Sequence, residues 1–202
     1  MAPGILSWGS PWALKACEVI LNSNSGETDF RHLTLFLYDS GEFQVRLFKS
    51  AATSAKIGRV AVFSDIKTIL ARIRSKGAPD VLFLRVPVDS GDALRLCGMI
   101  RARGTFPFPY LPIVAILEQA TKSAVTAVRD AGVDEFLASP YSPRSLLERV
   151  QAVRNDRRGF VDVESYFGPD RRRGAMAEWL DVNRRTGPAT LIDPVTEAVY
   201  TA

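Results

Sequence analysis

The chain has 202 residues, of which 47% are hydrophobic and 24% charged, with a net charge of +4. This composition indicates a globular protein with one domain of about 120–150 residues plus extensions. The single histidine, His32, leaves almost nothing for a Ser-His-Asp triad or a multi-histidine metal site, and Cys17 and Cys97 stand in no paired motif, which disfavours structural zinc and favours a reducing compartment.

Residues 1–31 form an N-terminal leader with three readings. Trp8, Trp12, Cys17, Val19 and Ile20 are spaced for a loose amphipathic helix, and NSNSGE at 22–27 is typical of a linker. The leader is a poorly ordered segment, a helix that docks on the domain or on a partner, or a membrane-surface attachment, the last lacking a strongly basic face. Because it has no basic start and no apolar run of about 20 residues, we expect a cytoplasmic chain without a membrane partner.

Five apolar runs alternate with five helical patterns over the next part of the chain. Strands are expected at 33–38, 59–63, 81–84, 111–117 and 134–138, and helices at about 43–51, 66–73, 92–103, 122–131 and 143–153. Ser64 is the expected N-cap of the second helix, Gly132 ends the fourth, and Ser142-Pro143 begins the fifth. This alternation predicts a right-handed, doubly wound parallel sheet of the α/β class.

The stretch PDVLFLRVPVDSG, residues 79–91, is the centre of this pattern. Its unbroken apolar run from Val81 to Leu84 is typical of a strand buried on both faces. Ligands of open α/β sheets bind beyond the carboxyl ends of the strands. Here that place is taken by Arg85. A loop that contains Pro, Ser and Gly follows it.

Two motifs resemble the receiver domains of bacterial response regulators. One is the Pro-Asp pair before the central strand, and the other is AGVDEFLASPYSPRSLLERV at 131–150. The resemblance covers roughly residues 33–155 and implies a flavodoxin-like sheet of order 2-1-3-4-5 over residues 32–156. It also implies that the chain is a signalling module and not an enzyme.

The resemblance places several unusual residues at the phosphorylation pocket. The Pro-Asp match puts Arg85 where the phosphoacceptor aspartate belongs, with a following loop two residues shorter than usual, whereas counting back from Pro87 puts Phe83 there. In receivers, a Thr or Ser after the fourth strand and a Lys after the fifth contact the phosphoryl group. The resemblance puts Leu117 at the first of these positions and Ser139 at the second. The other positions implied are the acid pair, here Tyr38-Asp39, and the aromatic switch residue, here Phe136.

These substitutions remove the groups that phosphorylation requires. A phosphoacceptor must be a nucleophilic carboxylate, and magnesium is held by several oxygen ligands. We therefore predict an inactive pseudoreceiver without metal or cofactor. Arg85 either pairs with Asp39 at the ends of their strands or points into solvent from the loop. Asp89 is a second candidate acid in that loop, although turn or helix capping suits it better.

Receivers of this type signal through the fourth helix, fifth strand and fifth helix, which correspond here to about 122–155. Because Leu117 can pack on Phe136 without a phosphoryl group, we expect a constitutive binding surface. Arg144, Glu148 and Arg154 supply charges on its last helix for partner choice. The expected partner is a histidine kinase, another regulator, or a second copy in a homodimer.

Residues 157–202 form a C-terminal extension of different composition. Its segment YFGPDRRR, with Arg171, Arg172 and Arg173, resembles a tail that follows receiver domains in some alphaproteobacterial regulators. Either it folds back on the domain or meets a partner protein, or its arginines and aromatics contact RNA or DNA phosphates in a nucleic-acid-associated regulator. Interleaved acids and the lack of an evident helix-turn-helix favour protein contact. A short helix is expected at 175–182, and the remainder is expected to be a tail.

Overall fold

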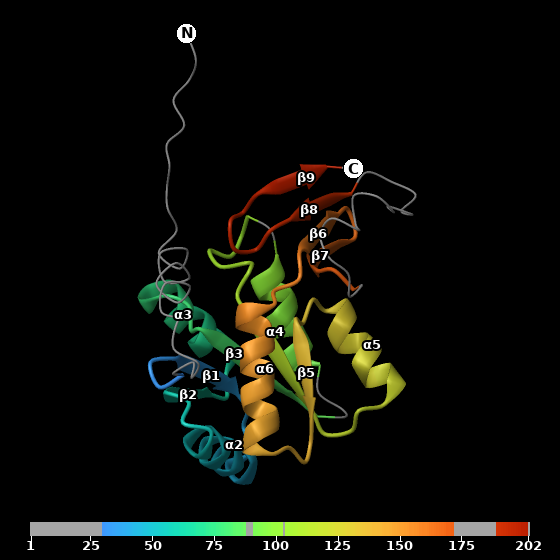
Figure 1. Cartoon of the computed structure of the whole chain (residues 1–202). Coiled ribbons are helices and arrows are strands. Elements are labelled where there is room, and N and C mark those ends of the chain that lie inside the picture. The colour runs from blue at the N-terminus through green and yellow to red at the C-terminus, as the bar shows by residue number, and fades with distance from the viewer. Residues whose placement is uncertain (1–29, 88–90, 103, 172–188, 202) are drawn as a thin grey trace.

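Five parallel strands and five helices alternate between residues 34 and 155 (Figure 1). The structure, a computed structural model, describes residues 30–87, 91–102, 104–171 and 189–201. The strands run in the order β2-β1-β3-β4-β5, so the predicted doubly wound sheet is confirmed. The elements are β1 (Thr34–Tyr38), α2 (Glu42–Ser54), β2 (Arg59–Phe63), α3 (Ile66–Lys76), β3 (Val81–Val86), α4 (Asp92–Arg101), β4 (Ile113–Leu117), α5 (Lys122–Asp130), β5 (Glu135–Ala138) and α6 (Pro143–Asn155).

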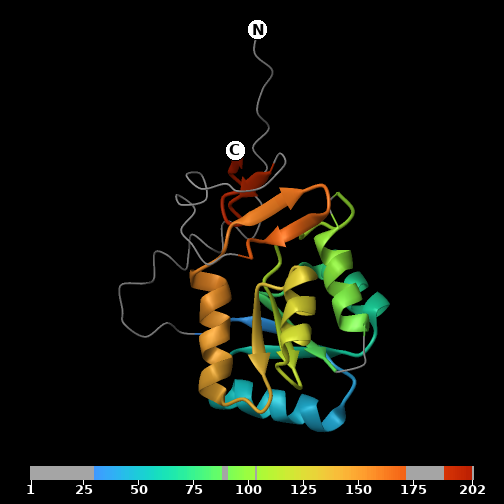
Figure 2. The ribbon, with the colours of Figure 1, turned by 90° about the vertical axis from the view of Figure 1, so that its right-hand side faces the viewer.

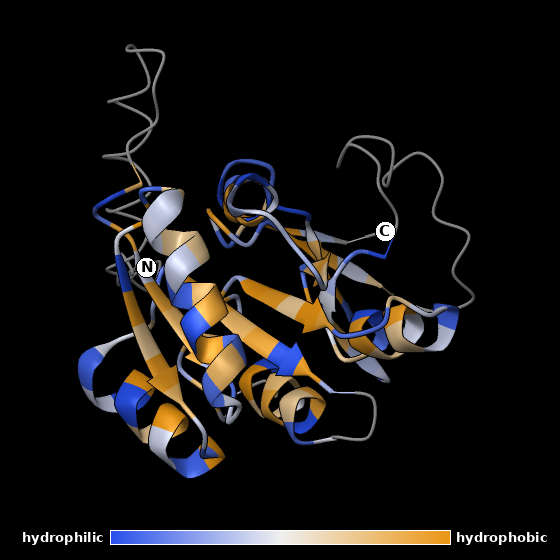
Figure 3. Ribbon diagram, turned by 90° about the horizontal axis from the view of Figure 1, so that it is seen from below, coloured by the Kyte–Doolittle hydropathy of each residue, from blue (hydrophilic) through white to orange (hydrophobic). Residues whose placement is uncertain are grey.

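The central strand β3 separates two hydrophobic cores. Val81 to Leu84 are 0% exposed, as the unbroken apolar run predicted. Successive side chains of a strand point to opposite faces, so Val81 and Phe83 pack with α2 and α6, whereas Leu82 and Leu84 pack with α3, α4 and α5. Figure 3 shows the resulting layers, with apolar strands lying between helices that carry hydrophilic residues.

The helix ends follow local signals, with one correction. Ser142 accepts a hydrogen bond from the Ser145 amide at 3.0 Å, with Pro143 in the first turn, as predicted. Gly132 follows α5 with φ +89°, a backbone conformation that favours glycine. The N-cap of α3 is Asp65 and not Ser64, because the Asp65 carboxylate accepts from the Thr68 amide at 2.7 Å. The predicted third helix ends at Arg101, two residues early, and β4 begins at Ile113.

The C-terminal extension contains a second sheet that the sequence did not predict. It consists of β6 (Phe160–Val163), β7 (Tyr166–Pro169), β8 (Thr190–Ile192) and β9 (Val199–Thr201), all antiparallel and in the order β7-β6-β8-β9. The expectation of a simple tail is therefore wrong for these residues, whereas the helix expected at 175–182 lies outside the described residues. Figures 1 and 2 both show this sheet at the end of the molecule opposite α2.

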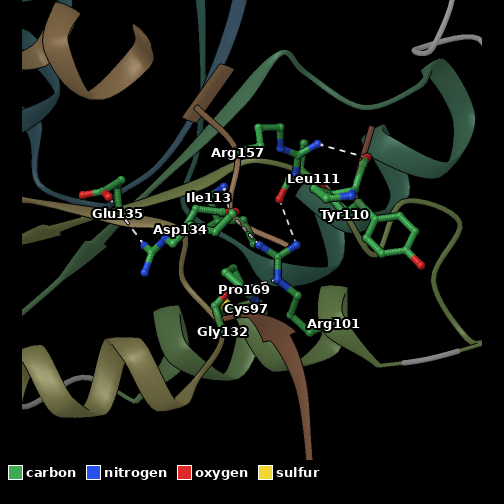
Figure 4. Close-up of polar contacts among 12 residues, drawn as sticks. Cys97, Arg101, Tyr110, Leu111, Ile113, Gly132, Asp134, Glu135, Arg157 and Pro169 are labelled. Atoms are coloured by element: carbon green, nitrogen blue, oxygen red, sulfur yellow. Dashed lines mark hydrogen bonds and ion pairs between the residues drawn. The ribbon is translucent and has the colours of Figure 1, made fainter. Parts of the chain in front are cut away.

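A buried polar cluster joins the second sheet to the amino edge of the parallel sheet (Figure 4). The Arg101 guanidinium donates to Asp134 Oδ2 at 2.8 Å and to the carbonyls of Leu111 and Gly132 at 2.8 and 2.9 Å. The same guanidinium lies 5.0 Å from the ring centre of Phe160 in β6. Arg101 therefore connects α4, the starts of β4 and β5, and the second sheet.

No helix among residues 30–87, 91–102, 104–171 and 189–201 is long and apolar enough to cross a membrane. The same residues hold no group of three or more His, Cys, Asp or Glu side chains placed to bind a metal ion. The expected cytoplasmic location stays a prediction.

Candidate functional site

The carboxyl edge of the parallel sheet brings together three charged side chains from neighbouring strands. Asp39 directly follows β1, Arg85 lies near the end of β3, and Glu118 directly follows β4. All three stand at alternate positions that point toward the α2 and α6 side, in line with Leu37, Phe83 and Ile116 of that core. The order β1-β3-β4 places Arg85 between the two acids.

The Arg85 guanidinium contacts both carboxylates. Its Nε lies 3.8 Å from Asp39 Oδ2, which is the ion pair predicted from the sequence, and its Nη2 donates to Glu118 Oε1. The side chains of Arg85 and Asp39 are 13% and 6% exposed, whereas that of Glu118 is 35% exposed. The alternative of a solvent-directed Arg85 is therefore wrong. Sequence reasoning missed Glu118, although its place directly after β4 was the available signal.

Asp39 lies in a mostly apolar environment. Burial raises the pKa of its carboxyl, and the Gly41 amide, which donates to Oδ1 at 2.9 Å, together with Arg85, opposes that shift. Burial also raises the pKa of Tyr141 to about 12, and the nearby Asp39 charge adds to the effect. Both groups therefore sit where a charge is poorly solvated.

These residues border a pocket of about 290 Å³ between α2 and the β5–α6 loop. Its polar members are Asp39, Arg85, Glu118 and Ser139, beside the Tyr141 ring. Its other lining residues are mainly apolar and come from β1, α2, β4 and the loop before α6: Leu37, Phe43, Gln44, Leu47, Phe48, Ile116 and Pro140. A small apolar pocket with a few convergent polar groups at the carboxyl edge of an α/β sheet is a typical ligand or partner site.

The sheet separates the predicted pocket residues into two groups. Tyr38 and Leu117 pack into the core on the α3, α4 and α5 side, away from Arg85. Leu117 is 1% exposed, and Phe136 packs against the same core. Leu117 and Phe136 thus share an apolar core, as expected for a switch pair without a phosphoryl group.

The alternative alignment that put Phe83 at the acceptor position is wrong. Phe83 is 0% exposed and packs edge-on against Phe48, with ring centres 4.9 Å apart. It therefore lies inside the core and cannot reach a ligand at the sheet edge. Asp89, the second candidate acid, lies outside the described residues.

Magnesium does not fit the residues at this edge. A magnesium ion needs oxygen ligands from the carboxylates, but the Arg85 guanidinium already contacts both Asp39 and Glu118. A divalent cation would have to displace a covalently attached positive charge, which repels it. Ser139 contributes its amide to the Leu117 carbonyl at 2.8 Å and has no cationic group to offer a phosphoryl oxygen.

The charges expected on the output face differ in exposure. Arg144 and Glu148 form an i,i+4 pair on α6 at 3.0 Å, with side chains 88% and 51% exposed. Arg154 instead pairs with Asp80 at 2.9 Å, and its side chain is 17% exposed. Arg154 is thus held by the domain, and its role in partner choice stays a prediction. A role for Arg144 and Glu148 in binding stays a prediction.

In the arginine segment, Arg171 contacts the domain. Its guanidinium lies 3.3 Å from Asp130 of α5 and 4.3 Å from the ring centre of Tyr166. This arrangement agrees with a segment that folds back on the domain. Arg172 and Arg173 lie outside the described residues, and nucleic-acid binding stays a prediction.

The chain has curated relatives among response regulators. No protein-family model matches it. Response regulator MprA of Mycobacterium avium is 32% identical over 87 residues, which are 43% of this chain and 36% of that protein. MprA of Mycobacterium leprae is 32% identical over 79 residues, 39% of this chain and 33% of that protein. The matches thus span about a third of the length of these relatives.

Solved structures of response regulators have a similar fold. A candidate response regulator from Chloroflexus aurantiacus is 26% identical with a TM-score of 0.54, covering 60% of this chain and 97% of that one. A response regulator from Thermotoga maritima is 19% identical with a TM-score of 0.52, covering 61% and 98%.

The receiver domain of the sensor histidine kinase PA1611 of Pseudomonas aeruginosa, which holds a magnesium ion in its active-site cleft, is 17% identical with a TM-score of 0.52, covering 61% and 98%. The last two likenesses concern the fold alone. The MprA relatives and the Chloroflexus structure support a receiver domain of the response-regulator type within this chain.

Proposed function

We propose that this chain is a signal-transduction module that works by phosphorylation-independent binding of a protein partner and catalyses no reaction. The observation that carries the proposal is Arg85, whose guanidinium contacts both Asp39 and Glu118 at the carboxyl edge of the sheet. A receiver responds to phosphate through a nucleophilic carboxylate and a bound cation. Here a cation of the chain itself stands between the two acids, in the place that a bound metal ion would need.

A switch also needs a ligand that binds its two states differently. Leu117 has no hydroxyl to follow a phosphoryl oxygen, and it is buried in the same core against which Phe136 packs. This packing supports a single arrangement of the α5, β5 and α6 surface. The level of signalling would then depend on the concentration of the chain and of its partner.

The first test is phosphorylation. The intact chain is incubated with acetyl phosphate and magnesium, beside a receiver domain known to accept phosphate, and both are analysed by intact-protein mass spectrometry. We expect no phosphoryl adduct on this chain. A stable adduct that disappears in Asp39→Asn or Asp89→Asn would contradict the proposal.

The second test concerns the binding surface, for which the proposed partner is a histidine kinase, another regulator or a second copy. The charges of the Arg144–Glu148 pair are exchanged in the double variant Arg144→Glu, Glu148→Arg. The control exchanges Asp92 and Arg95 on α4, another exposed pair with side chains 61% and 70% exposed. Weaker partner binding or self-association in the α6 variant alone supports the proposed surface. Equal behaviour of both variants, with loss of binding in the double variant Arg172→Glu, Arg173→Glu, would place the interface in the extension.

A further inference from the structure

The outer face of α2 carries two large apolar side chains that nothing among the described residues covers. Phe43 is 65% exposed and Leu47 is 41% exposed, and they stand one helical turn apart. Scattered apolar side chains are ordinary on a protein surface. These two instead line the same 290 Å³ pocket as Tyr141 and Arg85, so they form an apolar patch at that pocket.

The charge of the pocket restricts what can cover it. Two carboxylates, Asp39 and Glu118, face one guanidinium, that of Arg85. Glu118 is the more exposed of the two acids, with its side chain 35% exposed. An occupant that suits this pocket therefore presents apolar side chains together with a positive charge.

The N-terminal segment of the chain joins the domain on this same side of the sheet. Phe30 is buried in the core formed with α2, and its carbonyl accepts from the Gly58 amide at 3.0 Å. Gly58 allows this close approach, because a Cβ there would lie 2.4 Å from the Arg31 carbonyl oxygen. The described part of the chain therefore begins on the α2 side of the sheet.

The sequence of that segment matches the α2 face in the spacing of its large apolar residues and in reach, and it holds one basic side chain, Lys15, beside the acidic Glu18, Glu27 and Asp29. Trp8 and Trp12 stand four residues apart, as Phe43 and Leu47 do, and Lys15 follows Trp12 by three residues. The chain between Trp12 and Phe30 can extend for roughly 60 Å. The whole of α2 is about 20 Å long. The segment can therefore reach the pocket from its attachment point.

We propose that residues 1–29 dock on the α2 face of their own domain, with Trp8 and Trp12 against Phe43 and Leu47 and with Lys15 beside Glu118. The docked segment lies against the apolar residues that border the pocket of Arg85. It removes apolar surface from water and keeps other proteins from the α2 face. This inference rests on the α2 face alone, so it does not depend on whether the chain accepts phosphate.

The test follows the exposure of the two tryptophans to a quencher. In a full-length Trp179→Phe chain, fluorescence reports on Trp8 and Trp12, and acrylamide quenching measures their accessibility. The variant Leu47→Asp is compared with Met99→Asp, a matched control because Met99 on α4 is also 41% exposed. Circular dichroism verifies that both variants fold.

We expect the quenching constant to rise about twofold in Leu47→Asp and to stay unchanged in Met99→Asp, because docking buries the indole rings. Phe43→Ser should reproduce the effect of Leu47→Asp, and the values should not change with protein concentration. Equal quenching in the Leu47 and Met99 variants would overturn the proposal. Protection that appears only as the protein concentration rises would overturn it in favour of a second copy.

Discussion

At the residue scale, the position of Arg85 determines what the carboxyl edge can do. Because the side chain shares its face of the sheet with Asp39 and Glu118, one cation lies between two acids in a partly buried site. Burying a charge without a partner costs far more than a paired charge gains. Removing Arg85 therefore leaves two acids, one of them largely buried, without their shared cation.

Replacing Arg85 by Ala should lower the free energy of unfolding by about 2 kcal/mol, because it leaves Asp39 and Glu118 without their shared partner. Arg95→Ala, which breaks an exposed pair on α4, should change it by less than about 0.5 kcal/mol. Urea denaturation of both variants provides the measurement. Equal midpoints for Arg85→Ala and the parent chain would show that the ion pairs contribute nothing to stability.

The Arg85→Ala deficit should also depend on pH. Burial raises the folded-state pKa of Asp39 above 3.8, and Arg85 opposes this shift, so the variant should have a still higher Asp39 pKa. The folded state then holds the proton more firmly than the unfolded chain. The stability from the protonated carboxyl is full below 3.8 and is lost as the pH rises through the folded-state pKa. The deficit should therefore grow between pH 4 and 7, and a constant deficit would contradict this.

The thiol of Cys97 gives a third prediction at this scale. It is fully buried on α4, its Sγ lies 3.1 Å from the Ala131 carbonyl oxygen, and burial raises its pKa to about 12. Since the thiolate is the reactive form, a Cys17→Ser chain should not react with a thiol reagent at pH 8 until urea unfolds it. A fast stoichiometric reaction of the native chain would mean that α4 opens readily.

At the element scale, one buried ion pair connects α4 with the starts of two strands. Asp134 Oδ2 accepts from Arg101 and from the Ile113 amide, both at 2.8 Å. The side chains of Arg101 and Asp134 are 3% and 8% exposed. The pair thereby sets where β4 and β5 begin relative to α4, at the edge that the second sheet covers.

Asp134→Asn should lower the free energy of unfolding by about 3 kcal/mol, because it removes the negative charge and leaves the Arg101 cation buried without compensation. The control is Asp130→Asn on α5. The Asp130 side chain is 45% exposed, so its ion pairs with Arg129 and Arg171 should be worth less than about 1 kcal/mol. Thermal or urea unfolding distinguishes the two variants, and equal losses would contradict a special role for the buried pair.

At the scale of the whole molecule, the C-terminal extension is packed against the domain by aromatic rings. Phe160 is 0% exposed, and its ring centre lies 5.1 Å from that of Tyr110, which precedes β4, and 5.6 Å from that of Phe167. Arg157 adds polar contacts, donating to the carbonyls of Tyr110 and Pro194. The second sheet thus covers surface of the parallel-sheet domain that would otherwise face water.

Phe160→Ala should therefore cost about 3–5 kcal/mol of unfolding free energy, the usual range for a buried phenylalanine. We expect a single cooperative transition that involves both sheets. Tyr200→Ala on β9, where the side chain is 37% exposed, is the control and should change stability by less than about 0.5 kcal/mol. Two separate transitions in the parent chain would show that the extension folds independently.

Much of the parallel-sheet domain follows from the sequence by itself. Five apolar runs alternating with amphipathic helices are local patterns, and each specifies its element without reference to distant residues. The ion pair of Arg85 with Asp39 could also be predicted, because the resemblance to receivers implies that β1 and β3 lie side by side and that both end at the same edge.

Only the tertiary structure decided the remaining features. Glu118 contacts Arg85, and Tyr38 and Leu117 turn away from it, because the alternation of side chains along each strand assigns them to opposite faces. In the second sheet, the three-residue strand β8 pairs with β6 from about thirty residues earlier in the chain. Strands this short carry almost no periodic signal, so their pairing depends on the aromatic and charged surface that the folded domain presents to them.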